Sequence, residues 1–196
     1  MDAARGAAAG RTAANLASFL ALPRESSEQP SPHSDLLRLY LDAQEQEHKT
    51  SLAEIKAGQK SSHWIWWEWP AYAPVRSTSQ PEYDLPSCHA ATAWLAHELL
   101  GRRWKEITTA ATEHLENKRP PKRLFGSGTD AAKFHESMTL ASICAPHAEQ
   151  RELATRALTA LSQPPHPTVV RLAQAEQDAE AAQQATHDRS HPTKEV

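Results

Sequence analysis

Apolar residues recur at helical spacing through the middle of the chain, between residues 34 and 161. Ser34 can cap the first of these segments, and the later ones repeat the same one-sided pattern. No run alternates as a strand would, and β-branched residues are scarce. The sequence therefore predicts an all-α fold, a compact bundle of about five to six helices. The apolar positions are Leu36, Leu37, Tyr40 and Leu41; Leu52 and Ile55; Ala91, Trp94, Leu95 and Leu99; Trp104, Ile107, Ala111 and Leu115; and Leu153, Ala154, Ala157, Leu158 and Leu161.

Glycine, proline and serine mark the expected ends of these helices. A segment over Ser51–Ala57 follows the first one and is closed by Gly58, a typical residue just past a helix end. Ser87 can cap the next helix, which we expect to stop at Gly101, and the proline pair 120–121 breaks the helix after that. The segment 130–144 is nearly all apolar in its second half, so we place it at the centre of the bundle.

The regions on either side of this middle part differ in composition. Residues 1–33 are rich in Ala and Gly and then in Pro, Ser and Glu, whereas residues 163–196 open with prolines and continue as a polar Ala/Gln/Glu stretch. We interpret 1–33 as a disordered tail and 34–162 as the folded domain. Residues 163–196 are predicted to be a polar, mostly disordered tail, with one last helical turn around Val169.

Composition and charge narrow the class of protein. The 196 residues carry 21 Lys and Arg against 24 Asp and Glu, a formal net charge of −3 with neutral histidine. This balance argues against a nucleic-acid or membrane-surface binder, and no apolar run approaches the roughly 18 residues of a membrane span. Cys88 and Cys144 lack CxxC spacing, which argues against a disulfide scaffold or zinc ribbon and favours a reducing, cytoplasmic location. The alternative is an organelle, because Arg5 and Arg11 lie in an Ala-rich stretch typical of a transit peptide.

Residues 61–70, here named the Trp block, hold four of the six tryptophans within six positions. One buried indole can anchor several helices, so the Trp block is predicted to be a structural plug. The alternative is an aromatic-walled pocket, because indoles stack on planar heterocycles such as nucleobases. His63 and Glu68 would be its acid–base groups, since burial favours the neutral form of a carboxylic acid and suits it to proton transfer.

A second candidate feature is the Gly loop, residues 126–130, which leads into the helix that carries Lys133. Its two glycines let backbone N–H groups converge, and a helix N-terminus holds partial positive charge to which Lys133 adds a full one. Such a site can hold a phosphate. The alternative is a plain capping loop in which Thr129 or Asp130 caps the helix. No GxxxxGK[ST] loop is present.

Other catalytic and metal motifs are missing from the predicted domain. Its histidines show no HxxxH or HExxH pattern, so we predict no metal site, and we expect no cofactor. There is no GxSxG. Cys88 next to His89 does not by itself make a nucleophile–base pair, and Cys144 is predicted to be an apolar core residue.

Two blocks of the sequence together resemble a known family. Ser-His-Trp-Ile-Trp-Trp-Glu-Trp-Pro at 62–70 and Phe-Gly-Ser-x-x-Asp-x-x-Lys-x-x-x-Ser-Met at 125–138 resemble the hallmark blocks of the domain-of-unknown-function 1810 family. The resemblance spans about Ser34 to Leu161. It implies a compact all-α domain and no established reaction. Glu68 stands where the family usually has an aliphatic or aromatic residue.

These features lead to a first functional hypothesis, a small-ligand site between the Trp block and the Gly loop. A nucleotide-like or phosphate-bearing molecule would stack on the indoles and place its phosphate on the loop. This hypothesis requires Trp64 or Trp66 to be partly exposed and to face Lys133. The candidate binding residues are Trp64, Trp66, Trp69, Gly126, Ser127, Gly128, Asp130, Lys133 and Ser137, and the candidate catalytic residues are His63 and Glu68.

Two alternatives belong to other classes. One is a non-catalytic protein-interaction or structural module, whose protein partner the sequence does not identify. In that case we expect the indole rings to be buried in the core and Lys133 to lie in open solvent. The other is an N-glycosidase related to ADP-ribose or NAD metabolism. The order of an aromatic and acidic block followed by a Gly loop faintly resembles that superfamily.

Overall fold

The structure, a computed structural model, describes residues 33–190, and the predicted N-terminal tail with its transit-peptide alternative lies outside them. Within this range the regular elements are all helical and are accompanied by one isolated bridge between Tyr72 and Leu85, so the all-α prediction is confirmed. The helices are α1 (Ser34–Lys56), α2 (Ile65–Glu68), the 3-10 turn η1 (Pro81–Tyr83), α3 (Cys88–Ala96), α4 (Glu98–Glu116), α5 (Pro121–Leu124), α6 (Gly128–Cys144), α7 (Ala148–Leu161) and α8 (Pro167–Ser190).

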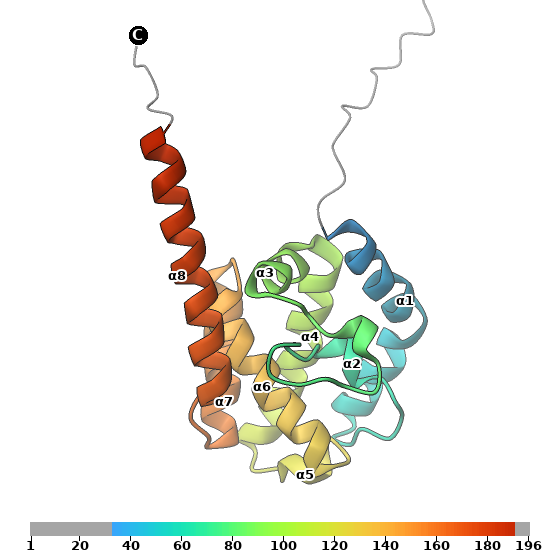
Figure 1. Cartoon of the computed structure of the whole chain (residues 1–196). Coiled ribbons are helices and arrows are strands. Elements are labelled where there is room, and N and C mark those ends of the chain that lie inside the picture. Colours follow the sequence, from blue (N-terminus) through green and yellow to red (C-terminus); the bar gives the residue numbers. More distant parts are fainter. Residues whose placement is uncertain (1–32, 191–196) are drawn as a thin grey trace, which may run out of the picture. The chain divides into compact units, whose positions relative to one another are not determined.

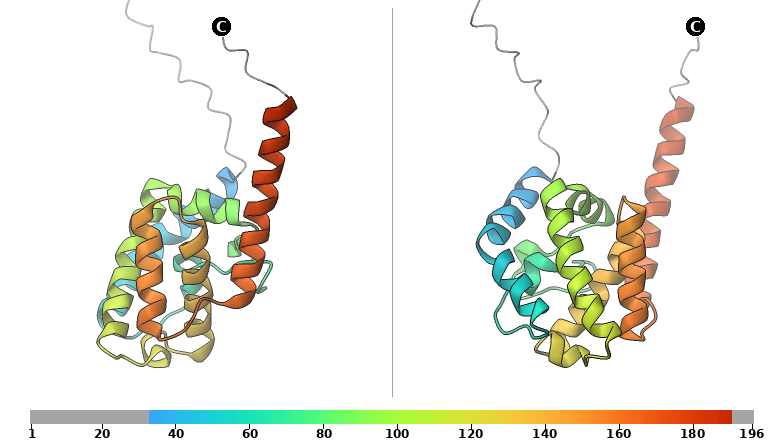
Figure 2. Two further views of the ribbon diagram at one scale, coloured as in Figure 1. Left: turned by 90° about the vertical axis from the view of Figure 1, so that its left-hand side faces the viewer. Right: turned by 180° about the vertical axis from the view of Figure 1, so that it is seen from behind.

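The longer helices pack side by side in the order α1, α4, α7, α6 and α8, as Figures 1 and 2 show. α3 packs against both α4 and α6. Aromatic rings fill the space between them: Trp69 packs edge-on against Phe134 with the ring centroids 4.7 Å apart, and Phe125 stacks on Phe134 at 4.5 Å. All three rings are fully buried. The core is therefore built around large aromatic side chains, as a plug formed by the Trp block requires.

α1 is one continuous helix of 23 residues where the sequence predicts two segments. Neither glycine nor proline interrupts it, so nothing in the chain breaks its hydrogen-bond ladder. Ser51, at the expected boundary, is fully buried, and its Oγ donates to the carbonyl of His48 at 3.0 Å and to Glu68 Oε1 at 2.7 Å. α1 ends before Gly58 as predicted, and Gly58 has the left-handed φ of 79° typical of that position.

The helix end predicted at Gly101 is wrong. α3 stops at Ala96 and α4 begins at Glu98, which leaves Gly101 inside α4. A Cβ atom at Gly101 would lie 2.3 Å from the carbonyl oxygen of Leu95. Glycine is therefore required because the last turn of α3 approaches the backbone of α4 closely, and not because a helix ends there.

α6 begins inside the predicted Gly loop. Ser127 is its N-cap, and the Ser127 Oγ accepts a hydrogen bond from the Asp130 N–H at 3.0 Å. The expectation that Thr129 or Asp130 caps this helix is therefore wrong. Because Ser127 does the capping, the Asp130 carboxylate is available for other partners.

The segment after residue 163 is more helical than predicted. α8 has 24 residues instead of the single turn expected around Val169. Val169 and Ala173 are fully buried where α8 packs on α6 and α3, whereas residues 178–186 are all exposed. Figures 1 and 2 show this outer part extending past the other helices. Most of the polar residues that suggested disorder are exposed to solvent, whereas Val169 and Ala173 lie on the face that packs on the other helices.

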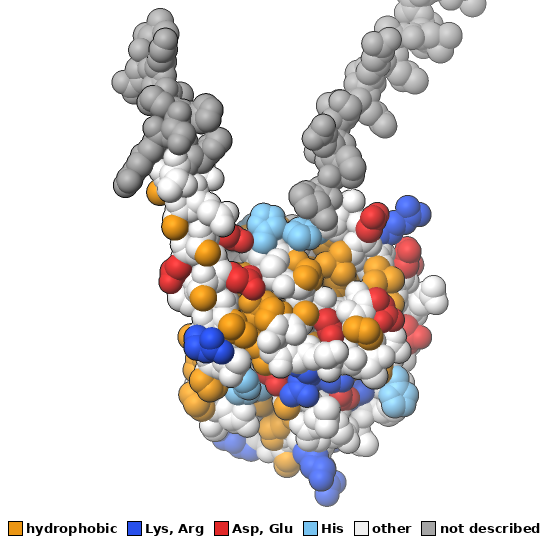
Figure 3. Space-filling model, in the orientation of Figure 1, with side chains coloured by type: hydrophobic (Ala, Val, Ile, Leu, Met, Phe, Trp, Pro, Cys, Tyr) orange, Lys and Arg blue, Asp and Glu red, His pale blue; other side chains and the backbone are white. Residues whose placement is uncertain are grey.

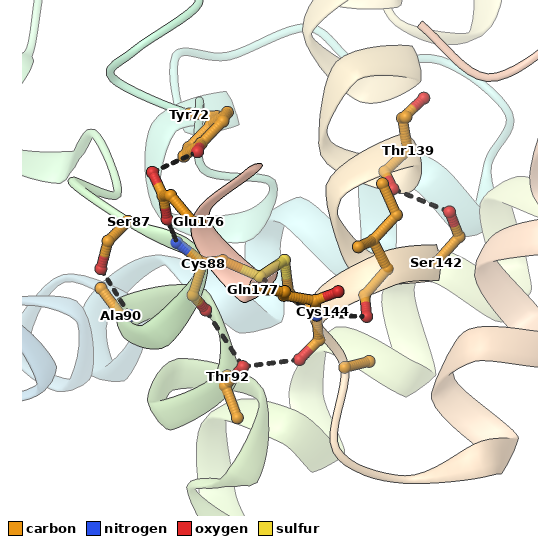
Figure 4. The surroundings of a disulfide bond; sticks show 12 residues. Tyr72, Ser87, Cys88, Ala90, Thr92, Thr139, Ser142, Cys144, Glu176 and Gln177 are labelled. Atoms are coloured by element: carbon orange, nitrogen blue, oxygen red, sulfur yellow. Dashed lines mark hydrogen bonds between the residues drawn. A yellow bond between two sulfur atoms is a disulfide. The ribbon is translucent and has the colours of Figure 1, made fainter. Parts of the chain in front are cut away.

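Cys88 and Cys144 form a disulfide, with their Cα atoms 5.6 Å apart. The bond joins the start of α3 to the end of α6, and α8 lies against it: Glu176 Oε2 accepts from the Cys88 N–H at 2.6 Å, and Gln177 Nε2 donates to the carbonyl of Ile143 at 3.3 Å (Figure 4). Cys144 is buried as predicted, but it is not a free thiol. The cysteine pattern therefore no longer supports a reducing compartment, because disulfides persist mainly in oxidising ones, and the cytoplasmic location stays a prediction.

The surface of the described residues carries few large apolar side chains. Val170 of α8 is the exposed one in this range. On the face drawn in Figure 3, hydrophobic side chains gather beside α8. Between residues 33 and 190, none of the helices combines the length and the apolar character needed to cross a bilayer.

Candidate functional site

A single carboxylate organises the start of the Trp block. Glu54, near the end of α1, accepts hydrogen bonds from the backbone N–H groups of Ser61 (2.8 Å) and Ser62 (3.1 Å). It also accepts from Ser62 Oγ at 2.6 Å and from Trp64 Nε1 at 2.7 Å. Trp64 is fully buried. Its ring is therefore part of the structural plug, with its N–H satisfied by Glu54.

The same contacts control the acidity of Glu54. Burial alone would raise the pKa of Glu54, but hydrogen bonds from Ser61, Ser62 and Trp64 outweigh it and lower the pKa from 4.5 to about 2. A carboxyl group whose pKa falls on folding stabilises the folded state above its unfolded pKa. That stabilisation is lost as the pH falls through the folded value.

We therefore expect Glu54→Gln to lower the free energy of unfolding at pH 7 by about 2 kcal/mol, because hydrogen bonds to a charged acceptor are replaced by weaker ones. The difference from the wild type should shrink as the pH falls from about 4.5 to about 2, measured by urea unfolding at several pH values. Glu113→Gln, a change at an exposed carboxylate of α4, is the control and should show no such dependence. A difference that stays constant over this pH range would contradict the role of Glu54.

Two buried lysines meet at one carboxylate beside the Trp block. Lys60 Nζ lies 2.8 Å from Asp130 Oδ2 and donates to the carbonyl of Ser62 at 2.7 Å, and Lys133 Nζ lies 3.5 Å from Asp130 Oδ1. The Lys60 and Lys133 side chains are 7% and 10% exposed. Within the described residues, Asp130 is the one carboxylate that forms an ion pair with either lysine. Two positive charges therefore share one negative charge, and a buried charge without a counter-ion is unfavourable.

Both ammonium groups also lie over indole faces. Lys60 Nζ is 5.2 Å from the ring centroid of Trp64, and Lys133 Nζ is 4.9 Å from that of Trp66. A cation placed in this way is attracted by the negative face of the ring. Trp66 is partly buried, and its Nε1 is buried without a hydrogen-bond partner. Lys60, Trp66, Asp130 and Lys133 are named the lysine–Trp66 site below.

The Gly loop lies directly against this site. The Lys60 N–H donates to the carbonyl of Leu124 at 2.7 Å, and a Cβ atom at Gly126 would lie 2.9 Å from the carbonyl oxygen of Lys60. Gly126 also has a left-handed φ of 78°. Glycine is therefore required at 126 for the close approach of the two segments. Gly128 faces open space, so packing does not require a glycine there.

Several of the predicted site residues lie away from both the lysine–Trp66 site and the Gly loop. Trp69 is fully buried, and its Nε1 donates to Thr108 Oγ1 at 3.0 Å. Ser137 is buried and lines a small internal cavity in the core. His63 is exposed, and it makes no hydrogen bond or ion pair with Glu68, which is itself completely enclosed. The assignment of His63 and Glu68 as catalytic residues stays a prediction.

Glu68 instead belongs to a buried hydrogen-bonded cluster between α1, α2 and α4. Both of its carboxylate oxygens lie 3.1 Å from His48 Nδ1, and Ser51 Oγ donates to Oε1 at 2.7 Å. On the other side of the ring, His48 Nε2 lies 4.0 Å from Glu106 Oε2. The Glu68 side chain has no exposure and that of His48 11%. Glu68 can therefore orient His48, but it cannot touch a ligand in this arrangement.

Sequence comparison now decides the family. The chain matches the family described as a protein of unknown function (DUF1810) over residues 34–163. The chain belongs to this family. α8, the helix that lies against the disulfide, begins beyond the matched range.

One solved structure is similar to this DUF1810 protein. It is the crystal structure of the conserved hypothetical protein Rv1873 from Mycobacterium tuberculosis, which is 27% identical with a TM-score of 0.61. The similarity covers 70% of this chain and 96% of that one. A comparison with curated proteins finds no match.

Sequence reasoning about this DUF1810 protein missed two residues that the structure makes central. Lys60 stands one position before the Trp block, and its charge beside an aromatic run was the available signal. His48 is three positions before Ser51 on α1, yet nothing in the sequence links either residue to Glu68. Between residues 33 and 190, no group of three or more His, Cys, Asp or Glu side chains is placed to hold a metal ion.

Proposed function

We propose that this protein binds a small phosphate-bearing, nucleotide-like ligand at the lysine–Trp66 site. One observation carries the proposal: Lys133 is buried against the ring of the partly buried Trp66 and shares its one carboxylate, Asp130, with Lys60. A phosphate group would supply the negative charge that the two lysines lack. A nucleobase could stack on the indole.

The position of α6 supports the same ligand. α6 has 17 residues and begins at Gly128, so its N-terminus carries partial positive charge on the side of the Gly loop. The exposed surface and open space at Gly128 leave room for a ligand to approach the first-turn amides. The charge of Lys133 and the field of the helix end act on an anion in the same direction.

The structural and ligand-binding interpretations of the Trp block apply to different residues. Trp64 and Trp69 are fully buried and fill the core, whereas Trp66 is only partly buried and lies beside Lys133. No reaction is included in the proposal, because the carboxylate predicted to be catalytic, Glu68, is enclosed by His48 and Ser51. The proposed function is therefore ligand binding.

The test is a titration of the full chain with ADP-ribose, NAD and ATP, followed by tryptophan fluorescence. We expect quenching by at least one of them below millimolar concentration, and we expect Trp66→Phe to remove most of that signal. Lys133→Gln should weaken binding about tenfold or more, because it deletes a charge-assisted contact to phosphate. Lys122→Gln, an exposed lysine of α5, is the matched control and should bind like the wild type.

Two results would count against the proposal. One is the absence of quenching by all three compounds at millimolar concentration. The other is quenching that Lys133→Gln leaves unchanged, which would place the ligand elsewhere. Thermal unfolding of each variant shows whether it is folded, so that a loss of binding is not confused with a loss of structure.

A further inference from the structure

A pocket of about 290 Å³ lies between one face of α1 and the side chains of Trp67 and Tyr83, and we name it the α1 pocket. Its volume is close to the lower end for small-molecule sites in proteins, so it suits a compact ligand. α1 lines it with positions 39, 42, 43, 46 and 47, whose spacing of three and four residues places them on one helical face. None of the four residues of the lysine–Trp66 site lines it, so its role is independent of the proposed function.

Two aromatic side chains form one wall of the α1 pocket. The rings of Trp67 and Tyr83 pack together with their centroids 5.4 Å apart, and both residues are partly buried. Buried side chains of α1 hold the backbone of each: Gln44 Nε2 donates to the Trp67 carbonyl at 2.7 Å, and the Tyr40 hydroxyl donates to the Tyr83 carbonyl. The aromatic wall is therefore fixed in place without a ligand.

The charge of the α1 pocket is negative. Asp42 and Glu47 line it, and its lining includes no Lys, Arg or His side chain. Between residues 33 and 190, neither of these carboxylates forms an ion pair. The nearby cations of α1, Arg38 and Lys49, are exposed and lie outside the lining. A cation entering the pocket would therefore meet two carboxylates without competition from a bound side chain.

The hydroxyl group of Tyr83 is subject to the same negative potential. Burial raises the pKa of Tyr83, and the charges of Glu82 and Asp42 raise it further. Glu82 is exposed beside the aromatic wall and adds to the charge of the two carboxylates in the lining. The aromatic wall and the negative charge therefore act on the same space.

We propose that the α1 pocket is a second binding site, for a small quaternary ammonium compound. Aromatic rings attract organic cations, and the rings of Trp67 and Tyr83 stand beside the carboxylates that would balance the charge. The apolar side chains of Leu39 and Ala43 complete the lining and would contact methyl groups. A primary ammonium group needs acceptors for three N–H bonds, whereas a fully methylated one needs none. The pocket therefore favours the methylated cation.

The test uses amide NMR spectra of the ¹⁵N-labelled full chain, titrated separately with choline, tetramethylammonium and ammonium ions at low ionic strength. We expect choline and tetramethylammonium to shift the amide signals of residues 39–47, Trp67 and Tyr83, and ammonium ions to leave them unchanged. Added salt should weaken the binding, because it screens the attraction between the cation and the carboxylates.

Two pairs of variants test the wall and the charge separately. Tyr83→Leu should weaken the binding of choline about fivefold, whereas Tyr83→Phe keeps the ring and should bind like the wild type. Asp42→Asn should weaken it about threefold. Glu152→Gln, a change at an exposed carboxylate of α7, is the matched control and should have no effect. Thermal unfolding shows that each variant is folded.

The outcomes separate this site from the lysine–Trp66 site. Lys133→Gln should leave the binding of choline at the α1 pocket unchanged. The proposal is overturned if neither choline nor tetramethylammonium moves the signals of residues 39–47, Trp67 and Tyr83 at millimolar concentration. It is also overturned if Tyr83→Leu and Asp42→Asn both bind like the wild type. Equal binding of ammonium and tetramethylammonium ions would overturn the assignment to a quaternary ammonium compound.

Discussion

Replacing Glu68 by alanine is expected to lower the free energy of unfolding by about 3–5 kcal/mol, the largest effect of any single substitution proposed for this protein. The carboxylate accepts from His48 Nδ1 and from Ser51 Oγ, and all three groups are buried. Its removal leaves two polar groups without partners inside the bundle, and each carries its own desolvation penalty. Urea unfolding at pH 7, with the slope of the transition unchanged, measures this loss.

Two further variants identify the cause. Glu68→Gln keeps an acceptor for Ser51 and is expected to lose less than Glu68→Ala. Glu106→Ala removes the carboxylate on the other side of the His48 ring. The Glu106 side chain is 51% exposed, so its loss should lower the free energy of unfolding by less than about 1 kcal/mol. Equal losses for Glu68→Ala and Glu106→Ala would show that the buried cluster contributes nothing special to stability.

Removal of the disulfide is expected to have a comparable effect. Cys88 and Cys144 are 56 positions apart in the chain, and closing a loop of that length restricts the unfolded state by about 4 kcal/mol in the chain-entropy description. The double variant Cys88→Ala, Cys144→Ala should therefore unfold at a markedly lower temperature than the wild type. The loss should extend to α8, because Glu176 and Gln177 hydrogen-bond to groups at the disulfide. Hydrogen exchange of the α8 amides reports that second effect.

A reductant provides the matched comparison. Under conditions in which mass spectrometry shows both thiols free, the wild type should lose about as much stability as the double variant, and the double variant should not respond. An unchanged unfolding temperature after full reduction would contradict the expectation. Purification of the protein under thiol-blocking conditions also shows which state the two cysteines hold in the protein's own compartment.

The lysine–Trp66 site was partly predictable from the sequence. Gly126, Asp130 and Lys133 stood together in one loop and the first turn of one helix, so their proximity followed from the local pattern. The inclusion of Trp66 and the exclusion of Trp69 did not follow, because neighbouring tryptophans in a single turn point in different directions and only packing decides which one meets the core. Lys60 entered the site because its backbone lies against the Gly loop, a contact between segments far apart in the chain.

The other corrections have the same origin. A glycine such as Gly101 is typical of a helix end, but here it allows the backbones of α3 and α4 to approach each other closely. The outer residues of α8 are as polar as a disordered tail, yet Val169 and Ala173 bury one face of its first turns. The composition of a segment predicts its average exposure to solvent. It does not predict which other segment one of its faces packs against.

What the sequence determined by itself was the class of fold, most helix positions and the membership in a family, because these depend on spacing and residue type over short windows. The tertiary structure alone decided that Trp64 and Trp69 fill the core while Trp66 lies beside Lys133, that Glu68 orients His48, and that two distant cysteines meet beneath α8. Each of these is a contact between segments of the chain separated by tens of residues. Such contacts are selected by how the apolar faces of whole helices pack together, and no short stretch of sequence contains that information.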